Sequence, residues 1–260
     1  MSRLATYRDA VLSLGYDFVK ARVLETAFEL DIFEWLGSGM KSARTLAREI
    51  KANEDSLQLF LNALVALGFL ATDGRGFQNT KFGREIFLKG KPLYVGDYVG
   101  LQTRSAGDWL ALKDSVLSGK PIDRPDFFKV DNPEVVAGFA RALYNTAIGH
   151  ADYLSRKLSL GSAKTLLDLG GGPGTFAIHF VQANPELRAT IFDLPATLEI
   201  TREYVERHGV LNRINFQAGD FHEDEIQGSF DVCFLSHIIH GQGMEQNQSL
   251  FKKIFAHLNP

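Results

Sequence analysis

The sequence predicts an α/β protein in two parts, a helical amino-terminal region followed by a doubly wound parallel sheet. Apolar residues recur at helical spacing up to about residue 160, and beyond it short apolar runs alternate with amphipathic segments. That alternation is typical of parallel strands covered by helices on both faces. The chain has 260 residues, of which 45% are hydrophobic and 23% charged. Such a composition supplies a sizeable core and excludes a disordered or collagen-like chain.

The first 80 residues are expected to form helices followed by a hairpin. A helix over 19–36 should stop at Gly37, because glycine adopts the conformation that ends helices at little cost. Two shorter helices over 43–50 and 56–67 follow, and strands on either side of a turn at 73–76 complete a small hairpin. Helix, turn, helix and a two-stranded wing in this order are typical of a winged-helix domain.

The obvious function of a winged helix, DNA binding, is disfavoured by charge. The second helix should project basic or amide side chains towards the bases. It offers Gln58 and Asn62 but no Lys or Arg, and Glu54 and Asp55 stand at its start. The whole chain has a formal net charge of −3, without the basic surplus that phosphate binding requires. The sequence therefore favours a packing or dimerisation role over nucleic-acid binding.

A further helical segment covers residues 92–157. Proline is favoured at the first position of a helix, because its missing N–H would be unpaired there anyway. A helix should therefore begin at Pro133, capped by Asp131 or Asn132. The boundary between the two parts of the chain is expected near residues 155–163.

Strands and helices alternate in the second part. Strands buried on both faces of a parallel sheet should be apolar throughout, as these runs nearly are. The predicted strands cover 165–169, 188–192, 214–218 and 230–236, and the predicted helices cover 175–183, 196–208 and 246–258.

The strongest functional signal is the glycine run at the end of the first predicted strand. It reads Asp168-Leu169-Gly170-Gly171-Gly172-Pro173-Gly174. Glycines here let a ligand approach the backbone near the amino terminus of the next helix. A dinucleotide fingerprint would need glycine at the next position and a phosphate loop would need lysine, but the residue is Thr175. The acidic Asp168 favours a cationic ligand over a pyrophosphate.

Acids also end the next two strands. Asp193, after the second strand, can accept hydrogen bonds from a ribose diol. Asp220, after the third strand, can reach an adenine amino group, while Phe221 can lie against the adenine ring. An acid in either place would by itself more often be a helix cap or a turn residue. Together with the glycine run, these residues predict an adenosine site.

Four segments resemble the class I S-adenosylmethionine-dependent methyltransferases, and more narrowly the small-molecule O-methyltransferases of plants and bacteria. They read LLDLGGGPGTFA at 166–177, FDLP at 192–195, FQAGDFHED at 216–224 and FDVCFLSHIIHGQG at 230–243. The winged-helix order matches as well, and in that family it serves dimerisation. The resemblance implies a homodimer, joined through its amino-terminal helices, that methylates a hydroxyl of an aromatic or polyketide-like small molecule. The single cysteine and the lack of a signal-peptide pattern predict a cytoplasmic protein.

The resemblance also implies roles for particular residues. Cofactor contacts fall on Asp168, Gly170, Gly172, Asp193, Leu194, Asp220, Phe221 and Ser236, acceptor contacts on Phe139 and Leu143, and catalysis on His240. Ser236 replaces a lysine that many plant members have, so its contact with the cofactor must differ. Gly241 and Gln242 replace the usual aspartate and tryptophan after the catalytic histidine. No metal is expected, since the acidic residues after Asp220 read as a solvated loop.

The proposed base, His240, has a neighbouring competitor. A neutral imidazole, with a pKa of about 6.5, is able to take the proton of a hydroxyl acceptor at pH 7. His237 is the alternative base. If the fourth strand continued, its alternation would place residues 236, 238 and 240 on one face and His237 on the other.

The resemblance divides the chain into a dimerisation domain over 1–95, an acceptor-pocket segment over 96–160 and a cofactor-binding domain over 161–260. In the family the sheet continues past the fourth strand, so we expect the last domain to be incomplete at its carboxyl end. The single cysteine, Cys233, excludes an internal disulfide. No signal peptide or membrane-spanning run is expected. The alternatives are an enzyme of the same cofactor class with a carbon or nitrogen acceptor, or a non-catalytic regulator that binds the cofactor or, through its winged helix, DNA.

Overall fold

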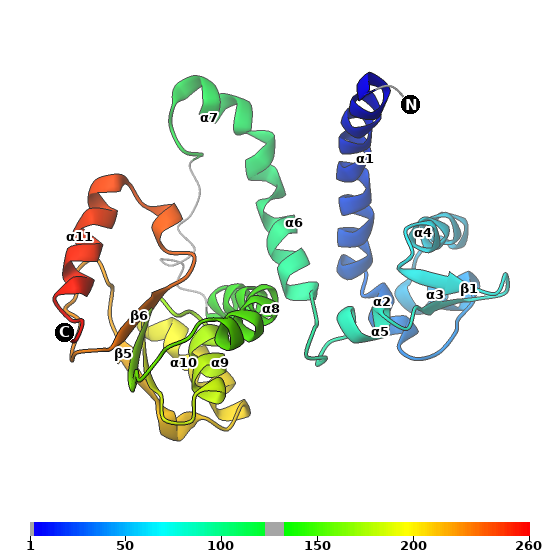
Figure 1. The fold of residues 1–260 in the computed structure, drawn as a ribbon. Helices are drawn as coiled ribbons and strands as arrows, with labels where there is room; N and C mark the ends of the chain where they lie inside the picture. The colour runs from blue at the N-terminus through cyan, green and yellow to red at the C-terminus, as the bar shows by residue number, and fades with distance from the viewer. Residues whose placement is uncertain (1–2, 123–132) are drawn as a thin grey trace. The chain divides into compact units, whose positions relative to one another are not determined.

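The computed structural model describes residues 3–122 and 133–260 of the chain. It divides into two compact units, Met1–Ile122 and Asp123–Pro260 (Figure 1). Each unit buries apolar side chains in a core of its own. No helix in the described ranges is long and apolar enough to cross a membrane.

The first unit is mainly helical. Its elements are α1 (Arg3–Glu29), α2 (Ile32–Leu36), α3 (Ala43–Ile50), α4 (Glu54–Ala66), β1 (Leu70–Thr72), β2 (Phe77–Asn79), α5 (Gly83–Ile86), α6 (Gly96–Leu110) and α7 (Leu112–Ser118). The predicted helices at 43–50 and 56–67 are present, and so is the hairpin, in which Leu70 pairs with Asn79. The Asn79 side chain donates hydrogen bonds of 2.8 Å to the carbonyls of Phe33 and Gly37, which ties the hairpin to α2.

The prediction of one helix over 19–36 is wrong. The structure has two helices there, α1 and α2, because the chain breaks at Asp31, whose φ is 50°. Aspartate visits this left-handed conformation more readily than most residues. The break turns Ile32, Phe33 and Leu36 into the core of the first unit, while most of α1 stays exposed.

The second unit is a parallel sheet, as the sequence predicts, and its strand order is β5-β4-β3-β6. Its strands are β3 (Thr165–Leu169), β4 (Arg188–Asp193), β5 (Ile214–Ala218) and β6 (Val232–Leu235), and its helices are α8 (Pro133–Lys157), α9 (Thr175–Ala183), α10 (Pro195–Arg207), the short η2 (Leu211–Arg213) and η3 (Ile239–Gly241), and α11 (Met244–Phe255). Helix α8 begins at Pro133, as predicted. Its proposed capping residues, Asp131 and Asn132, lie outside the described residues.

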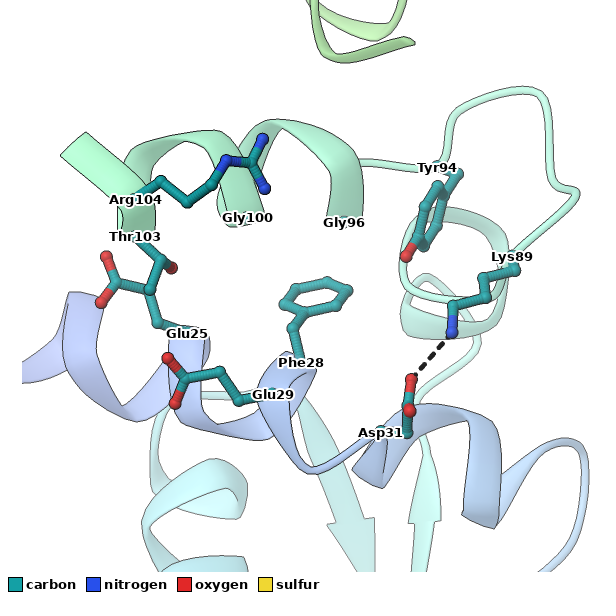
Figure 2. A pocket seen from close by; sticks show the side chains of 10 residues that line it. All are labelled: Glu25, Phe28, Glu29, Asp31, Lys89, Tyr94, Gly96, Gly100, Thr103 and Arg104. Carbon is teal, nitrogen blue, oxygen red and sulfur yellow. Dashed lines mark hydrogen bonds and ion pairs between the residues drawn. The ribbon is translucent and has the colours of Figure 1, made fainter. Parts of the chain in front are cut away.

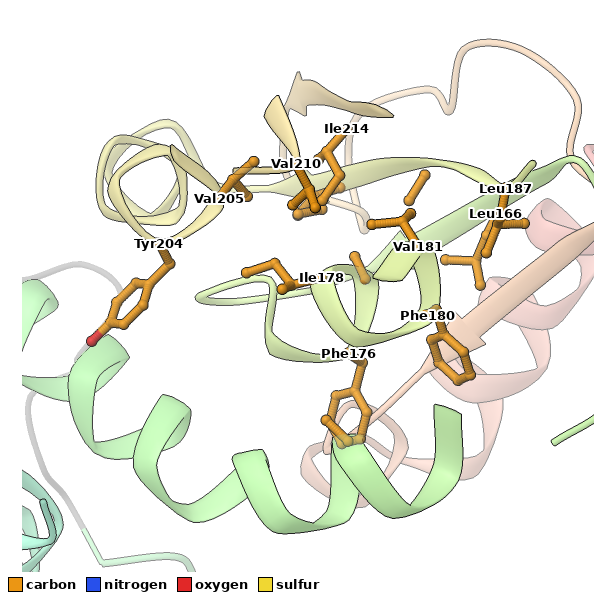
Figure 3. Close-up of a cluster of buried hydrophobic side chains, with 14 of the residues drawn as sticks. Leu166, Phe176, Ile178, Phe180, Val181, Leu187, Tyr204, Val205, Val210 and Ile214 are labelled. Atoms are coloured by element: carbon orange, nitrogen blue, oxygen red, sulfur yellow. The ribbon is translucent and has the colours of Figure 1, made fainter. Parts of the chain in front are cut away.

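Both faces of this sheet are buried. Leu166 of β3 joins the cluster shared with α8, α9 and α10 (Figure 3). Its neighbours Leu167 and Leu169 join a second cluster with Leu250 and Ile254 of α11. Successive side chains of a strand point to opposite faces, so an apolar strand of this kind requires helices on both sides.

Candidate active site

The strand order gathers the predicted site segments at one edge of the sheet. In a parallel sheet all carboxyl ends meet at the same edge, and a crevice forms where the strand order reverses. Here β4 and β5 lie on one side of β3 and β6 lies on the other. The glycine run follows β3, Asp193 ends β4, Gly219–Phe221 follows β5 and Ser236–His240 follows β6. Segments far apart in the sequence therefore surround the end of β3.

The glycine run makes a turn that other residues would strain. Gly170 has a φ of 65°, and a Cβ built on it would lie 2.3 Å from Cδ1 of Ile238. Gly174 has a φ of 74°, and its Cβ would lie 2.7 Å from Cδ1 of Ile191. Both separations are far below van der Waals contact, so glycine is required for the chain to pass here.

Asp193 ties three strand ends together. Its Oδ2 accepts a 2.7 Å hydrogen bond from the Gly172 N–H, and its Oδ1 accepts one of 2.7 Å from the Leu194 N–H. Its carbonyl accepts a third, of 3.0 Å, from the Gly219 N–H. A carboxylate has about four lone-pair sites, so each oxygen can still accept from a ribose hydroxyl. Burial raises the pKa of Asp193, and the two N–H donors oppose that shift.

Asp168 is a second acid at this edge, near Asp193, and it is buried. Its side chain is 1% exposed, and its Oδ2 accepts a 3.2 Å hydrogen bond from the Ala177 N–H. Burial, with a contribution from the charge of Asp193, raises the pKa of Asp168 to about 7. Burial also raises the pKa of the Cys233 thiol to about 12, and the charge of Asp168 adds to this shift.

The donor set of this pair suits a cationic ligand. In the described part of the chain, backbone N–H groups and the Thr197 hydroxyl donate to the two carboxyl groups, and no Lys or Arg does. Buried carboxylates without a basic partner are costly, so a positive ligand would stabilise them. The residues therefore fit S-adenosylmethionine, whose sulfonium and ammonium groups are positive and whose ribose needs an acceptor. No three His, Cys, Asp or Glu side chains within the described ranges could hold a metal ion.

The loop after β5 brings Phe221 to the glycine turn. A Cβ on Gly170 would lie 3.5 Å from Cε1 of Phe221. Lys253 of α11 donates to the Phe221 carbonyl at 3.1 Å and so holds the loop. Asp220 accepts the His222 N–H on Oδ1 at 2.8 Å, and its own N–H donates to Asp224. The ring of Phe221 thus lies beside the predicted cofactor turn, and Asp220 shapes the loop that carries it.

The expectation for the segment after β6 is wrong. The strand ends at Leu235 rather than at residue 236, and His237 has a φ of 57°. This left-handed residue redirects the chain, and His240 lies in the 3₁₀ turn Ile239–Gly241. Strand alternation therefore does not separate the two histidines, whose ring centroids are 5.5 Å apart at an angle of 81°. Ser236 follows the strand directly and is half-buried.

Ile238 is a site residue that the sequence did not single out. Its Cδ1 lies against Gly170, next to the place reached by Phe221. The only signal for it was its position between the two histidines, and that position does not fix the direction of a side chain. Together, Ile238 and Phe221 form an apolar cover beside the glycine turn.

Helix α8, which belongs to the predicted acceptor-pocket segment, also contacts the glycine turn. Cδ1 of Leu143 would lie 3.9 Å from a Cβ on Gly172, which places this acceptor-pocket candidate beside the glycine run. Phe139, one turn earlier on α8, is half-buried.

The first unit contains a cavity of about 320 Å³ between α1 and α6 (Figure 2). Its acidic groups Glu25, Glu29 and Asp31 are each paired with a basic side chain. Lys89 donates to Asp31 at 2.9 Å, and Arg22 bonds to Glu25 at 2.6 Å and to Glu29 at 3.3 Å. The chemistry predicted from the sequence lies in the second unit, not here.

Known proteins resemble both parts of the chain. The family model of the O-methyltransferase domain matches residues 111–260, and that of the O-methyltransferase dimerisation domain matches residues 12–89. The tetracenomycin polyketide synthesis 8-O-methyl transferase of Streptomyces glaucescens is 31% identical over 96% of this chain and 75% of that protein. The 3-hydroxy-5-methyl-1-naphthoate 3-O-methyltransferase of Streptomyces sahachiroi is 30% identical over 89% of this chain and 68% of that protein.

A solved structure supports the fold. Human N-acetylserotonin methyltransferase in complex with S-adenosylmethionine matches with a TM-score of 0.83 and 21% identity. The match covers 100% of this chain and 78% of that one.

Proposed function

Because the chain belongs to the S-adenosylmethionine-dependent O-methyltransferases, we propose that it methylates a hydroxyl of an aromatic or polyketide-like small molecule, with His240 as general base. The observation that carries the proposal is the position of the histidine pair. His237 and His240 follow β6, the strand that pairs with β3, whose carboxyl end bears the glycine turn. A proton acceptor therefore stands at the same edge as the predicted cofactor site.

The chain's own residues bind and orient the cofactor in this proposal. Bound S-adenosylmethionine supplies an activated methyl group on a sulfonium. Gly170 and Gly172 let it approach the backbone, Asp193 accepts the ribose hydroxyls, and Asp168 stabilises its positive charge. The remaining proposed contacts are Leu194, Asp220, Phe221 and Ser236.

The base completes the chemistry. Methyl transfer is an in-line displacement, in which positioning alone can supply up to about 7–11 kcal/mol. The acceptor hydroxyl loses its proton as it attacks, and an imidazole that takes this proton contributes about 10²–10⁴-fold. His240 takes this role, and His237, whose ring is 5.5 Å away, is the competing base.

The acceptor is expected to be apolar and aromatic. Phe139 and Leu143 of α8 supply an apolar wall, and Leu143 reaches the glycine turn. Two relatives are named for polyketide and naphthoate methylation, which supports the same class of acceptor for this chain.

A homodimer is part of the proposal. Helix α1 exposes Leu4, Tyr7, Leu14 and Tyr16, whose exposed fractions are 76%, 71%, 69% and 69%. Exposed apolar stretches of this length are typical of protein interfaces. The match of residues 12–89 to a dimerisation domain supports a second copy of the chain as the partner.

The test compares His240→Gln with His237→Gln. With S-adenosylmethionine and 3-hydroxy-5-methyl-1-naphthoate as probes, we expect His240→Gln to lower turnover by about 10²–10⁴-fold. Calorimetric affinity for S-adenosylhomocysteine should stay within about twofold of wild type. Full turnover in His240→Gln would overturn the base, and a product methylated on carbon or nitrogen in an acceptor panel would replace the hydroxyl acceptor.

A further inference from the structure

Helix α11 is tied to the turn that carries His240. Nδ2 of Asn247, in the first turn of α11, donates a 2.9 Å hydrogen bond to the carbonyl of Ile239. That carbonyl belongs to the planar peptide group that joins Ile239 to His240. Fixing the plane of this peptide fixes the position of the His240 Cα and so restrains the direction in which its side chain leaves the backbone.

The His240 ring depends on its backbone for orientation. It is exposed, and its ring centroid lies 5.5 Å from that of His237. Its turn is otherwise closed by a long hydrogen bond, 3.2 Å, from the Gly241 N–H to the Ile238 carbonyl. The Asn247 bond is therefore a principal restraint on the turn.

The other end of the Asn247 amide indicates that this residue is not there for stability. A carbonyl can only accept, so Nδ2 must face Ile239 and Oδ1 must face the opposite way. Oδ1 is buried and finds no donor among the described residues, as is also true of Oε1 of Gln242 in the same segment. A buried acceptor without a donor is destabilising. The gain from the Ile239 bond is offset within the same side chain.

We propose that Asn247 is a positioning residue for His240, acting through the Ile239 carbonyl; the inference rests on the proposed function, in which His240 is the base. Asn247 does not touch the reacting atoms. It holds the peptide before His240 so that the imidazole faces the acceptor.

Two substitutions at position 247 separate positioning from stability. Asn247→Leu keeps a side chain of similar size and removes both the donor and the unpartnered oxygen. Asn247→Asp keeps the shape, removes the donor and puts a negative charge against the Ile239 carbonyl. The matched control is Gln246→Leu, because Gln246 caps the same helix by accepting the Gly243 N–H at 3.0 Å and makes no bond to Ile239.

The first measurement is the steady-state rate of methylation of 3-hydroxy-5-methyl-1-naphthoate as a function of pH. We expect both Asn247 variants to lower kcat by about ten- to a hundredfold, with KM for S-adenosylmethionine within about twofold of wild type. The acidic limb of the Asn247→Asp profile should move to higher pH, because a negative charge near the turn raises the pKa of the base. The thermal midpoint of Asn247→Leu should equal that of wild type.

The second measurement needs no acceptor. In protein saturated with S-adenosylhomocysteine, the His240 ring protons are assigned by their absence from the NMR spectrum of His240→Gln. They should shift or broaden in both Asn247 variants and remain unchanged in Gln246→Leu.

The outcomes distinguish the two proposals. Full activity in His240→Gln overturns the general base and this inference with it. Loss of activity in His240→Gln, with wild-type kcat or unchanged His240 signals in both Asn247 variants, overturns this inference alone. An equal loss of kcat in Gln246→Leu also overturns it, because the effect would then come from the start of α11 in general.

Discussion

The cavity of the first unit and the sheet edge of the second unit both gather acidic side chains, but they neutralise them differently. In the cavity, Asp31 has Lys89 as its partner (Figure 2). At the sheet edge, Asp168 is buried and Asp193 is half-buried, and among the described residues only backbone and hydroxyl groups donate to them. Paired charges at a surface stabilise each other and indicate no ligand. Acids whose pKa values burial raises, without a basic partner, indicate a site that a ligand completes.

The largest expected effect comes from Asp193. Asp193→Ala removes the proposed ribose acceptor and frees the Gly172 and Leu194 N–H groups. A hydrogen bond to a charged group contributes about 1.5–3 kcal/mol. Losing the two proposed bonds from the ribose hydroxyls should therefore weaken S-adenosylhomocysteine binding at least about a hundredfold. Calorimetric titration measures this affinity. Asp193→Asn keeps one acceptor oxygen, so its affinity should lie between those of wild type and Asp193→Ala. Unchanged affinity in Asp193→Ala would remove the distinction between the two acidic regions.

Two glycines with the same backbone conformation test the packing of the site. Gly170 and Gly119 have φ values of 65° and 66°, but a Cβ on Gly119 meets nothing within 4 Å. Gly119→Ala should cost about 1–2 kcal/mol for the left-handed conformation alone. Gly170→Ala must also displace Ile238, which adds about 1–3 kcal/mol, and it should weaken S-adenosylhomocysteine binding. Chemical denaturation gives both values, and equal losses would contradict the close packing at Gly170.

The pKa of Asp168 gives the comparison a pH dependence. Its pKa of about 7 in the folded protein lies above its ordinary 3.8. The folded state therefore keeps a proton that the unfolded chain loses, and stability falls as the pH rises from about 4 to about 7 and then levels. Asp168→Asn should reduce this slope in denaturation curves, and the part that remains belongs to Asp193, whose pKa is also raised.

The same group links protons to cofactor binding. A positive cofactor favours the ionised carboxylate, so binding below pH 7 should release a proton and weaken by up to about tenfold for each pH unit lost. Calorimetry of S-adenosylmethionine at pH 6 in buffers of different ionisation enthalpy counts that proton. A count of zero in wild type, or the same count in Asp168→Asn, would assign the proton elsewhere.

The smallest effect is expected in the first unit. Lys89→Met breaks the pair with Asp31, whose two side chains are 61% and 51% exposed. Exposed pairs contribute about 0.2–1 kcal/mol, so thermal unfolding should change little and S-adenosylhomocysteine affinity should not change. A large loss of affinity would mean that the cavity takes part in cofactor binding.

Local signals in the sequence predicted most of the fold. Strand β3 and helices α3 and α9 begin and end at the predicted residues, because apolar runs and helical spacing mark them directly. The prediction failed where single residues adopt a left-handed backbone, at Asp31 between α1 and α2 and at His237 after β6. Nothing in their neighbours requires that conformation, so the sequence pattern continued through both.

The sequence by itself determined which strands carry Asp168, Asp193 and the Gly170 turn, since parallel strands bring their carboxyl ends to one edge regardless of detailed packing. Only the tertiary structure decided that Ile238 packs on Gly170 and that His237 and His240 lie together. It also decided that Asn247 of α11 bonds to the carbonyl of Ile239, in the turn that carries His240. These contacts depend on the direction the backbone takes after β6. The φ of His237 sets that direction, and packing against residues far away in the sequence, as of Ile238 on Gly170, fixes this angle.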